Sequence, residues 1–374
     1  MELGLNEEQE LLKASAEKYF RDNYSFELRR NYIETASNNN KQWKHFSDLG
    51  WLGLPLDTKY GGYSGNISDV MVLMETFGSS LVLEPYVNFI ILSGKIIEKF
   101  SPSDKAALIL PLIIRGERKI SFAFSEPYSR YDNKEVQTIA IKDKQSWILK
   151  GMKNFVIGSS FCDQFLIPAI CKEEKEIKIF LLNKKTENLV INSYENIDNS
   201  SVADITLNNL KVDNSNLIGS CKKEAYEKNI DYLIDYATLS NCSQALGIID
   251  KMYELTLEYV KTRKQFGKKI GDFQVIQHRL VDIFIKKEEM RSLNYMAQVN
   301  MHKSDKERKR NISMNKIFLG THANHISQEC IQIHGGMGVA DEMRIGHYFK
   351  RLTSLNTIFG NTDYHYERYA DNAV

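Results

Sequence analysis

The periodicity of the apolar residues changes twice along the chain, and this limits the possible folds more than any other feature. Between about residues 119 and 222, short runs such as VQTIAIK (136–142) alternate apolar and polar residues or are rich in β-branched ones. Before and after this stretch, apolar residues recur at steps of three and four, as in Leu246, Ile249 and Tyr253. Alternation is typical of strands, and steps of three and four are typical of one helix face. The sequence therefore predicts a helical part, a β part and a second helical part.

We predict an α+β multidomain protein on this basis. Residues 1–118 form an N-terminal all-α domain, residues 119–222 a middle antiparallel β domain, and residues 223–374 a C-terminal four-helix bundle. The bundle is expected because four long helical stretches are joined by short loops.

Composition excludes several classes of function. The net charge of +1 offers no basic field for nucleic acid or an anionic membrane surface. The longest apolar runs, such as LILPLII (108–114), are too short to span a bilayer. The N-terminus is acidic and amphipathic rather than signal-like, so we expect a cytoplasmic protein. The five cysteines contain no CxxC pair, which favours free thiols over disulfides or a zinc site: Cys162, Cys171, Cys221, Cys242 and Cys330.

Common catalytic motifs are missing from the sequence. There is no P-loop, no HExxH and no GxSxG. The segment HGGMG (334–338) is rich in glycine, but it follows a helical pattern rather than a strand, so it is not a Rossmann fingerprint. His322 and His325 are spaced to share one helix side, but packing or surface exposure is the usual role of such a pair, and we expect no metal.

Four other stretches are specific when taken together. They are FAFSEP (122–127), WILKGMK (147–153), RKQFGKKIGDFQ (263–274) and QIHGGMG (332–338). In this order, and over essentially the whole chain, the sequence resembles the acyl-CoA dehydrogenase family. The segments GHYFKRL and FGNTDYHYERYA resemble one branch of it, which includes small subunits of pimeloyl-CoA dehydrogenases and subunits of heteromeric sterol side-chain dehydrogenases.

The resemblance implies that FAD binds between the β domain and the bundle. Arg263 matches the arginine that a neighbouring subunit brings to the pyrophosphate, although on its own it could be an ordinary surface cation. Ile157 replaces a threonine that hydrogen-bonds the flavin, and Ser125 stands where threonine is usual. The complete set that the resemblance assigns to the cofactor is Arg263, Phe266, Phe273, Gln274, Gln332, Gly335, Gly336, Phe124, Ser125, Phe155, Ile157 and Thr362.

The catalytic base of the family is missing from both of its usual positions. The resemblance aligns Gly360 with the glutamate before the last helix, and Ala237 with the alternative glutamate, 26 residues before Arg263. Asp363 is a weak candidate, and its ordinary interpretation is the N-cap of the last helix. Asp235 is a second weak candidate, but it is rotated by about 200° around its helix from position 237.

One further segment departs from the family pattern. Tyr128, Ser129, Arg130 and Tyr131 replace a glycine-rich loop that lies close to the thioester substrate in family members. We expect these larger side chains to reshape or fill that approach.

We therefore expect an FAD-dependent protein of the acyl-CoA dehydrogenase type that catalyses α,β-dehydrogenation of an acyl-CoA thioester. It would be a subunit without its own base that works with a homologous partner chain, in a dimer, a tetramer or a hetero-oligomer. The electron acceptor would resemble electron-transfer flavoprotein. Three alternatives stay open: a self-sufficient enzyme with an unusual base, a non-catalytic flavin-binding scaffold, and an oxidase or monooxygenase on the same fold.

Overall fold

The computed structural model describes residues 4–35 and 40–373. By its internal contacts the chain divides into two compact units. The first consists of Met1–Asn31, Ile67–Val82 and Thr238–Val374, and the second of Tyr32–Asn66 and Leu83–Ala237. Helix α7 (Lys223–Thr262) contributes residues to both units, as does α2, whose last three residues belong to the second.

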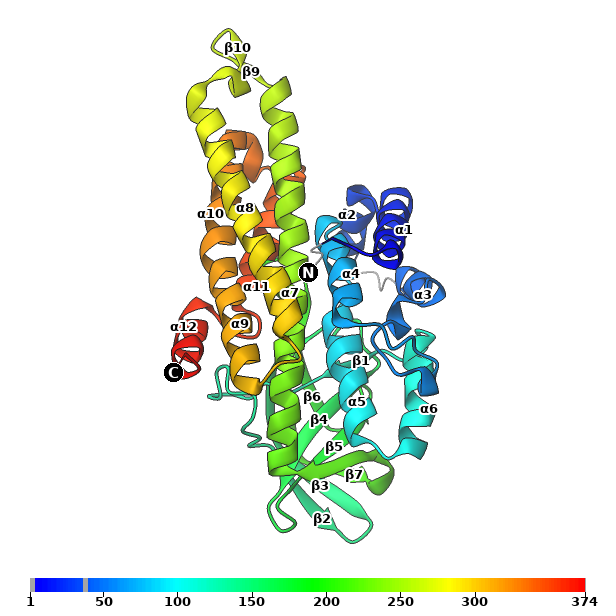
Figure 1. Cartoon of the computed structure of the whole chain (residues 1–374). Helices are drawn as coiled ribbons and strands as arrows, with labels where there is room; N and C mark the ends of the chain where they lie inside the picture. The colour runs from blue at the N-terminus through cyan, green and yellow to red at the C-terminus, as the bar shows by residue number, and fades with distance from the viewer. Residues whose placement is uncertain (1–3, 36–39, 374) are drawn as a thin grey trace. The chain divides into compact units, whose positions relative to one another are not determined.

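The first unit is helical. Helix α1 begins at a capping box, in which the Asn6 side chain accepts from the Gln9 amide at 2.8 Å and the Gln9 side chain accepts from the Asn6 amide at 3.2 Å. At the far end of the unit, strands β9 and β10 form a short hairpin between α7 and α8 (Figure 1). The helices and strands are α1 (Glu7–Asn23), α2 (Phe26–Glu34), α4 (Ile67–Ser79), α8 (Gln274–Asn300), α9 (Asp305–Phe318), α10 (Asn324–His334), α11 (Arg344–Thr357), α12 (Thr362–Asp371), β9 (Lys264–Gln265) and β10 (Lys268–Lys269).

The core of this unit lies among α7, α8, α10 and α11. Leu246, Ile283, Ile326 and Leu355 are almost inaccessible to solvent and belong to one apolar cluster. Helix α4 crosses α7 so closely that a Cβ at Gly247 would lie 1.8 Å from the Glu75 carbonyl oxygen. Glycine is therefore required at this crossing. Helices α9 and α10 are joined by a π-helical turn (Leu319–Ala323), so they continue one another.

The second unit is built on an eight-stranded sheet with the order β6-β7-β3-β2-β4-β5-β8, and β1 pairs with β4. The sheet is antiparallel apart from two pairings, β1 with β4 and β2 with β4, which are parallel. The strands are β1 (Ile120–Phe122), β2 (Ile139–Asp143), β3 (Ser146–Ile157), β4 (Gln164–Cys171), β5 (Glu176–Asn183), β6 (Leu189–Glu195), β7 (Ser201–Asp213) and β8 (Leu217–Lys222).

Helical segments accompany this sheet in the second unit: α3 (Asn40–Asp48), a π-helix (Val87–Gly94), α5 (Lys95–Phe100) and α6 (Ser103–Ile114). The type of secondary structure changes between α6 and β1, and again between β8 and α7. The predicted α+β class, with a helical part, a β part and a C-terminal helical bundle, is confirmed.

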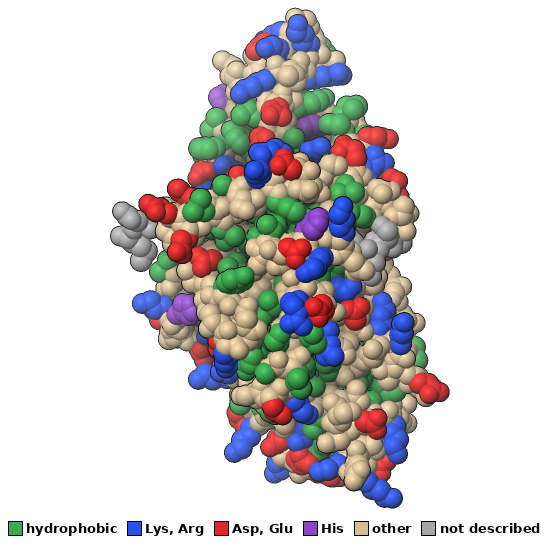
Figure 2. All heavy atoms as spheres, turned by 90° about the vertical axis from the view of Figure 1, so that its right-hand side faces the viewer, with side chains coloured by type: hydrophobic (Ala, Val, Ile, Leu, Met, Phe, Trp, Pro, Cys, Tyr) green, Lys and Arg blue, Asp and Glu red, His purple; other side chains and the backbone are tan. Residues whose placement is uncertain are grey.

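The surface agrees with the near-zero net charge. On the face that Figure 2 presents, basic and acidic side chains are interspersed. Within the described ranges, no helix is both long and apolar enough to cross a bilayer.

Candidate functional site

The loop before α12 has an unusual backbone. Phe359 and Gly360 both lie in the left-handed half of conformational space, with φ of +63° and +117°. Asn361 then starts α12, because its side chain accepts from the Tyr364 amide at 3.0 Å. The expected N-cap role of Asp363 is therefore wrong: Asn361 holds that place, and Asp363 is an exposed residue of the first turn.

Position 360 has no room for a side chain. A Cβ there would lie 2.5 Å from Tyr364 Cδ1 and 2.6 Å from His365 Nε2. The surrounding backbone is buried. The loop therefore lacks a carboxylate at this position, and it could not accept one without moving both aromatic side chains.

Two buried side chains hold this loop by its carbonyl oxygens. Lys316 Nζ donates to Leu355 O at 2.5 Å and to Ile358 O at 2.9 Å, and its burial lowers the pKa of the amine to about 8. His365 Nε2 lies 3.1 Å from Phe359 O, and its Nδ1 lies 3.2 Å from Ser313 Oγ. Burial, together with the nearby Lys316 charge, lowers the pKa of His365 well below its ordinary value, so the imidazole is neutral and donates from Nε2.

The alternative base position lies on α7. Ala237 is completely buried and has no acidic group. Asp235 is also buried, with 1% of its surface exposed. Because the two residues are separated by about 200° around the helix, Asp235 does not share the face of Ala237.

Thr362 packs tightly within the first unit. Its hydroxyl faces Gly320, where an added Cβ would lie 1.9 Å from Thr362 Oγ1 and 2.8 Å from Asn356 Oδ1. Asn356 Oδ1 is buried, and no hydrogen-bond donor reaches it from the described residues. The neighbourhood of Thr362 thus contains an acceptor that a ligand or water could satisfy.

In the second unit, the predicted flavin residues gather where β3 meets the segment after β1. The Asn154 amide donates to Ser125 O at 3.0 Å. Phe155 adopts a left-handed backbone (φ +51°), and its amide donates to Asp204 Oδ1 at 3.0 Å. Phe124, Ser125, Phe155 and Ile157 are all half-buried. This arrangement fits an aromatic-walled surface that a planar ring could cover.

A buried ion pair anchors this region. Lys153 Nζ lies 2.5 Å from Glu126 Oε1, and both side chains are at most 2% exposed. Glu126 also accepts from the Thr138 hydroxyl at 2.6 Å and the Gln137 amide at 2.6 Å. Burial alone would raise the pKa of Glu126, but the Lys153 charge and these donors lower it below its ordinary value. Glu126 therefore ties both ends of the 126–138 loop together.

The loop carries two exposed side chains on left-handed backbone. Tyr128 is 98% exposed and has φ of +68°, and Arg130 is exposed with φ of +48°. The Tyr128 side chain thus extends into solvent, whereas Ser129 and Tyr131 are half-buried, and the expected change to the substrate approach stays a prediction. What differs from a glycine loop is the backbone, which carries two larger residues in left-handed conformations.

The remaining cofactor candidates lie at the hairpin end of the first unit. Arg263 is exposed, and within the described residues its guanidinium makes no hydrogen bond or ion pair. Phe266 is 91% exposed with φ of +54°, and its ring meets Phe273 edge-on at 6.3 Å. Gln274 is also exposed. This end therefore offers a cation and an aromatic ring to something outside the unit.

The glycine segment belongs to the same end. The Tyr259 ring stacks on His334 with centroids 4.4 Å apart, which joins the end of α7 to the end of α10. Gln332, Gly335 and Gly336 are exposed beside this contact, and a Cβ at either glycine would meet nothing within 4 Å. Gly335 needs its φ of +61°, but the unit itself gives no reason for Gly336. Open backbone next to a cation fits the diphosphate of a dinucleotide.

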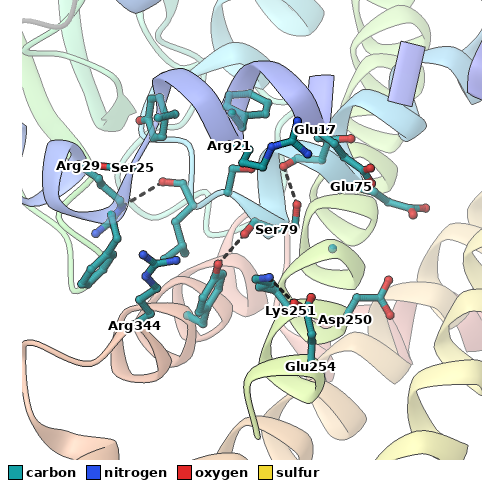
Figure 3. Close-up of a pocket in the computed structure, with 18 of the residues that line it drawn as sticks. Glu17, Arg21, Ser25, Arg29, Glu75, Ser79, Asp250, Lys251, Glu254 and Arg344 are labelled. Atoms are coloured by element: carbon teal, nitrogen blue, oxygen red, sulfur yellow. Dashed lines mark hydrogen bonds and ion pairs between the residues drawn. The ribbon is translucent and has the colours of Figure 1, made fainter. Parts of the chain in front are cut away.

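A polar cavity of about 700 Å³ also lies in the first unit (Figure 3). Two of its charged residues, Lys251 and Glu254, pair with each other at 2.6 Å. Two others, Glu75 and Asp250, both pair with Arg291, which is not a lining residue. Burial raises the pKa of Glu75 to about 7. Nothing in the sequence singled out this cavity, because its walls come from five helices that are far apart along the chain.

Two of the histidines noted in the sequence have ordinary partners, and His325 is exposed. His322 Nε2 lies 3.0 Å from Glu289 Oε2, and His334 Nδ1 lies 2.8 Å from Cys330 O. Across the part of the chain that the structure describes, no group of three or more His, Cys, Asp or Glu residues could hold a metal ion.

Comparison with known families decides the assignment. Family profiles for the N-terminal, middle and C-terminal domains of acyl-CoA dehydrogenases match residues 6–117, 121–213 and 229–374. This chain belongs to the acyl-CoA dehydrogenase family. Membership supports FAD as the cofactor, and the residues at both candidate surfaces fit that group.

Individual relatives within the family are distant. CarC, a subunit of the caffeyl-CoA reductase–Etf complex of Acetobacterium woodii, is 28% identical over 319 residues, which cover 81% of each chain. Acryloyl-CoA reductase (NADH) of Anaerotignum propionicum is 25% identical over 98% of this chain and 94% of the relative. The ChsE4-ChsE5 complex of Mycobacterium tuberculosis contains a chain of the same fold, with a TM-score of 0.88 and 19% identity over 100% of this chain and 99% of that one.

Proposed function

We propose that this chain is an FAD-binding subunit of an acyl-CoA dehydrogenase, which takes part in α,β-dehydrogenation of an acyl-CoA thioester but relies on a partner chain for the base. The observation that carries the proposal is at Gly360. This position has no side chain, and the neighbouring Tyr364 and His365 leave no space for one. A base must lie within hydrogen-bond reach of the carbon whose proton it takes.

The cofactor would be held by two sets of residues. Arg263 and the open backbone at Gly335 and Gly336 would bind the diphosphate, where a guanidinium provides two charge-assisted hydrogen bonds. Ser125 and Phe155 would contact the ring. When bound, FAD supplies the acceptor for the hydride that leaves the β carbon.

Two features support a chain that works together with another subunit rather than alone. The hairpin residues Arg263 and Phe266 extend from the surface of their own unit, which suits binding to a cofactor shared with another subunit. Similar proteins include a chain of the ChsE4-ChsE5 complex and the CarC subunit of the caffeyl-CoA reductase–Etf complex. We therefore propose a homologous chain as partner and an electron-transfer flavoprotein as acceptor.

One observation favours a second candidate, a self-sufficient dehydrogenase. Asp235 is a buried carboxyl group two residues from the alternative base position, and a small change in helix register would alter its direction. The exposed Asp363 is less suitable, because burial is the usual way in which a carboxyl group is tuned to act as a base. If Asp235 were the base, Asp235→Asn would abolish flavin reduction by substrate, whereas Asp363→Asn would not.

Isolation of the tagged chain from its native host tests the main proposal. We expect a flavin absorption spectrum and a co-purifying homologous chain that carries a glutamate at the position of Gly360 or Ala237. A colourless protein that does not take up added FAD would exclude the flavin-binding role. Isolation of a yellow, active protein that contains this chain alone would exclude the partner.

A further inference from the structure

Lys316 is a lysine at the centre of the first unit with no exposed surface. It belongs to α9, yet its ammonium group reaches the last turn of α11 and the following loop. Leu355 O, one of its acceptors, is in the last turn of α11, and Ile358 O, the other, lies just beyond the helix end. The carbonyl groups at a helix C-terminus have no partner within the helix, and they attract a positive charge.

The groups that face Lys316 leave it without a carboxylate. The Cys242 thiol faces it from α7, and burial raises the pKa of that thiol to about 11. His365 faces it from α12 and is neutral, and Arg368 on the same helix acts on His365 as a further positive charge. No Asp or Glu among the described residues lies within ion-pair distance of Lys316 Nζ. Its contacts with main-chain carbonyls therefore replace the usual ion pair.

His365 completes the hold on the loop from the opposite side. Its Nε2 donates to Phe359 O, and its Nδ1 accepts from Ser313 Oγ, which belongs to α9 like Lys316. Three main-chain acceptors between residues 355 and 359, Leu355 O, Ile358 O and Phe359 O, are thus bound by side chains that are themselves buried. The same imidazole occupies the space into which a side chain at position 360 would project.

We propose that Lys316 is a positioning residue, which fixes the 358–361 loop, together with His365, in the conformation that leaves no room for a side chain at position 360. The identification of this loop with the reaction site rests on the proposed function. The mechanical claim does not, because it depends only on contacts within the first unit.

Because protonation of Lys316 is coupled to opening of the loop, the pH dependence of opening tests this claim. The pKa of the amine is about 8 in the closed structure, and it returns toward about 10.5 when opening of the loop exposes the group to water. The open state then binds more protons than the closed state between these two values. Opening therefore becomes less favourable as the pH rises through this window.

Hydrogen exchange of the wild-type protein tests this prediction without any substitution. We expect the protection of the Ile358, Tyr364 and His365 amides, corrected for intrinsic exchange rates, to rise about tenfold or more between roughly pH 8 and pH 10. Amides in the middle of α8 provide the internal reference. Equal pH dependence in both regions would overturn the proposal.

Two variants separate positioning from simple packing. Lys316→Met keeps an unbranched side chain that is one atom shorter and removes its donors, so protection of these three amides should fall about tenfold relative to α8, and their specific pH response should disappear. Lys316→Arg keeps the donors and should preserve most of the protection. Lys306→Met replaces an exposed lysine of the same helix and is the matched control.

The proposal fails if the amides of this loop are equally protected in the Lys316→Met and Lys306→Met proteins. It also fails if Lys316→Met lowers the protection of amides throughout the unit to the same extent. Neither measurement uses an acyl-CoA. A failure here therefore leaves the proposed function standing, and a failure of the proposed function leaves this result interpretable.

Discussion

At the scale of single residues, position 360 combines a left-handed backbone conformation with too little space for a side chain. A φ of +117° is strained for any residue with a Cβ, and the nearest atoms belong to two aromatic side chains rather than to flexible chain ends. The buried hydrogen bonds of His365 make that ring costly to move. Glycine at this position is thus built into the packing, and replacing it is not a simple way to restore a base.

Gly360→Glu should therefore destabilise the protein without producing strong activity. Backbone strain and the collision with Tyr364 and His365 together cost about 2–4 kcal/mol, which urea denaturation of wild type and variant will measure. Gly360→Ala is the matched control, because it has the same strain and a smaller collision. Robust turnover by the glutamate variant with a ferrocenium-type acceptor, over acyl-CoA thioesters of several lengths, would refute this view of the loop.

At the scale of elements, the contact between α4, α7 and α8 brings two carboxyl groups to one arginine. Glu75 on α4 shares Arg291 on α8 with Asp250 on α7. Burial outweighs the attraction of Arg291 and raises the pKa of Glu75 to about 7. The folded protein therefore keeps a proton on this carboxyl group that the unfolded chain releases near its ordinary pKa of 4.5.

This shift fixes the sign of a pH effect on stability. Because the folded state binds more protons between about pH 4.5 and pH 7, the free energy of unfolding should fall as the pH rises through that range. Glu75→Gln removes this dependence, and it should stabilise the protein relative to wild type by about 1–3 kcal/mol near pH 8. Urea denaturation at pH values across the range measures the difference. Parallel pH profiles for the two proteins would show that Glu75 titrates normally.

The types of the elements were predictable from sequence, whereas their partners were not. Periodicity indicates whether a segment is helix or strand, as in Leu246, Ile249 and Tyr253 of α7, because side-chain direction follows local geometry. The parallel pairing of Ile120 with Gln164 has no such local pattern. The contact of Lys316 with Leu355 O spans 39 residues and depends on the packing of α9 against the end of α11.

At the scale of the whole molecule, the cofactor residues were proposed from resemblance and stay predictions. The structure brings Arg263 and Gly336 to one end of the first unit through the stacking of Tyr259 on His334. It also brings Ser125 and Phe155 together in the second unit through the bond between the Asn154 amide and Ser125 O. Resemblance could identify these residues, but only packing explains why residues 75 positions apart, such as Tyr259 and His334, become neighbours.

Arg263→Gln should weaken the binding of FAD without affecting the fold. Loss of one charge-assisted pair with the diphosphate corresponds to an affinity about 10- to 100-fold lower, which titration of the apoprotein with FAD, followed by flavin fluorescence, will measure. Lys264→Gln neutralises the adjacent exposed cation on the same hairpin and is the control. Equal affinities for the two variants would remove Arg263 from the cofactor site.

Anaerobic mixing of the purified, FAD-loaded protein with acyl-CoA thioesters of graded length tests the central claim most directly. Loss of flavin absorbance near 450 nm reports transfer of hydrogen from the substrate. We predict no loss with this chain alone, and a rapid loss once the co-purified homologous chain is present. Stoichiometric bleaching by this chain alone would contradict the account, because it would require a base that neither Gly360 nor Ala237 can supply.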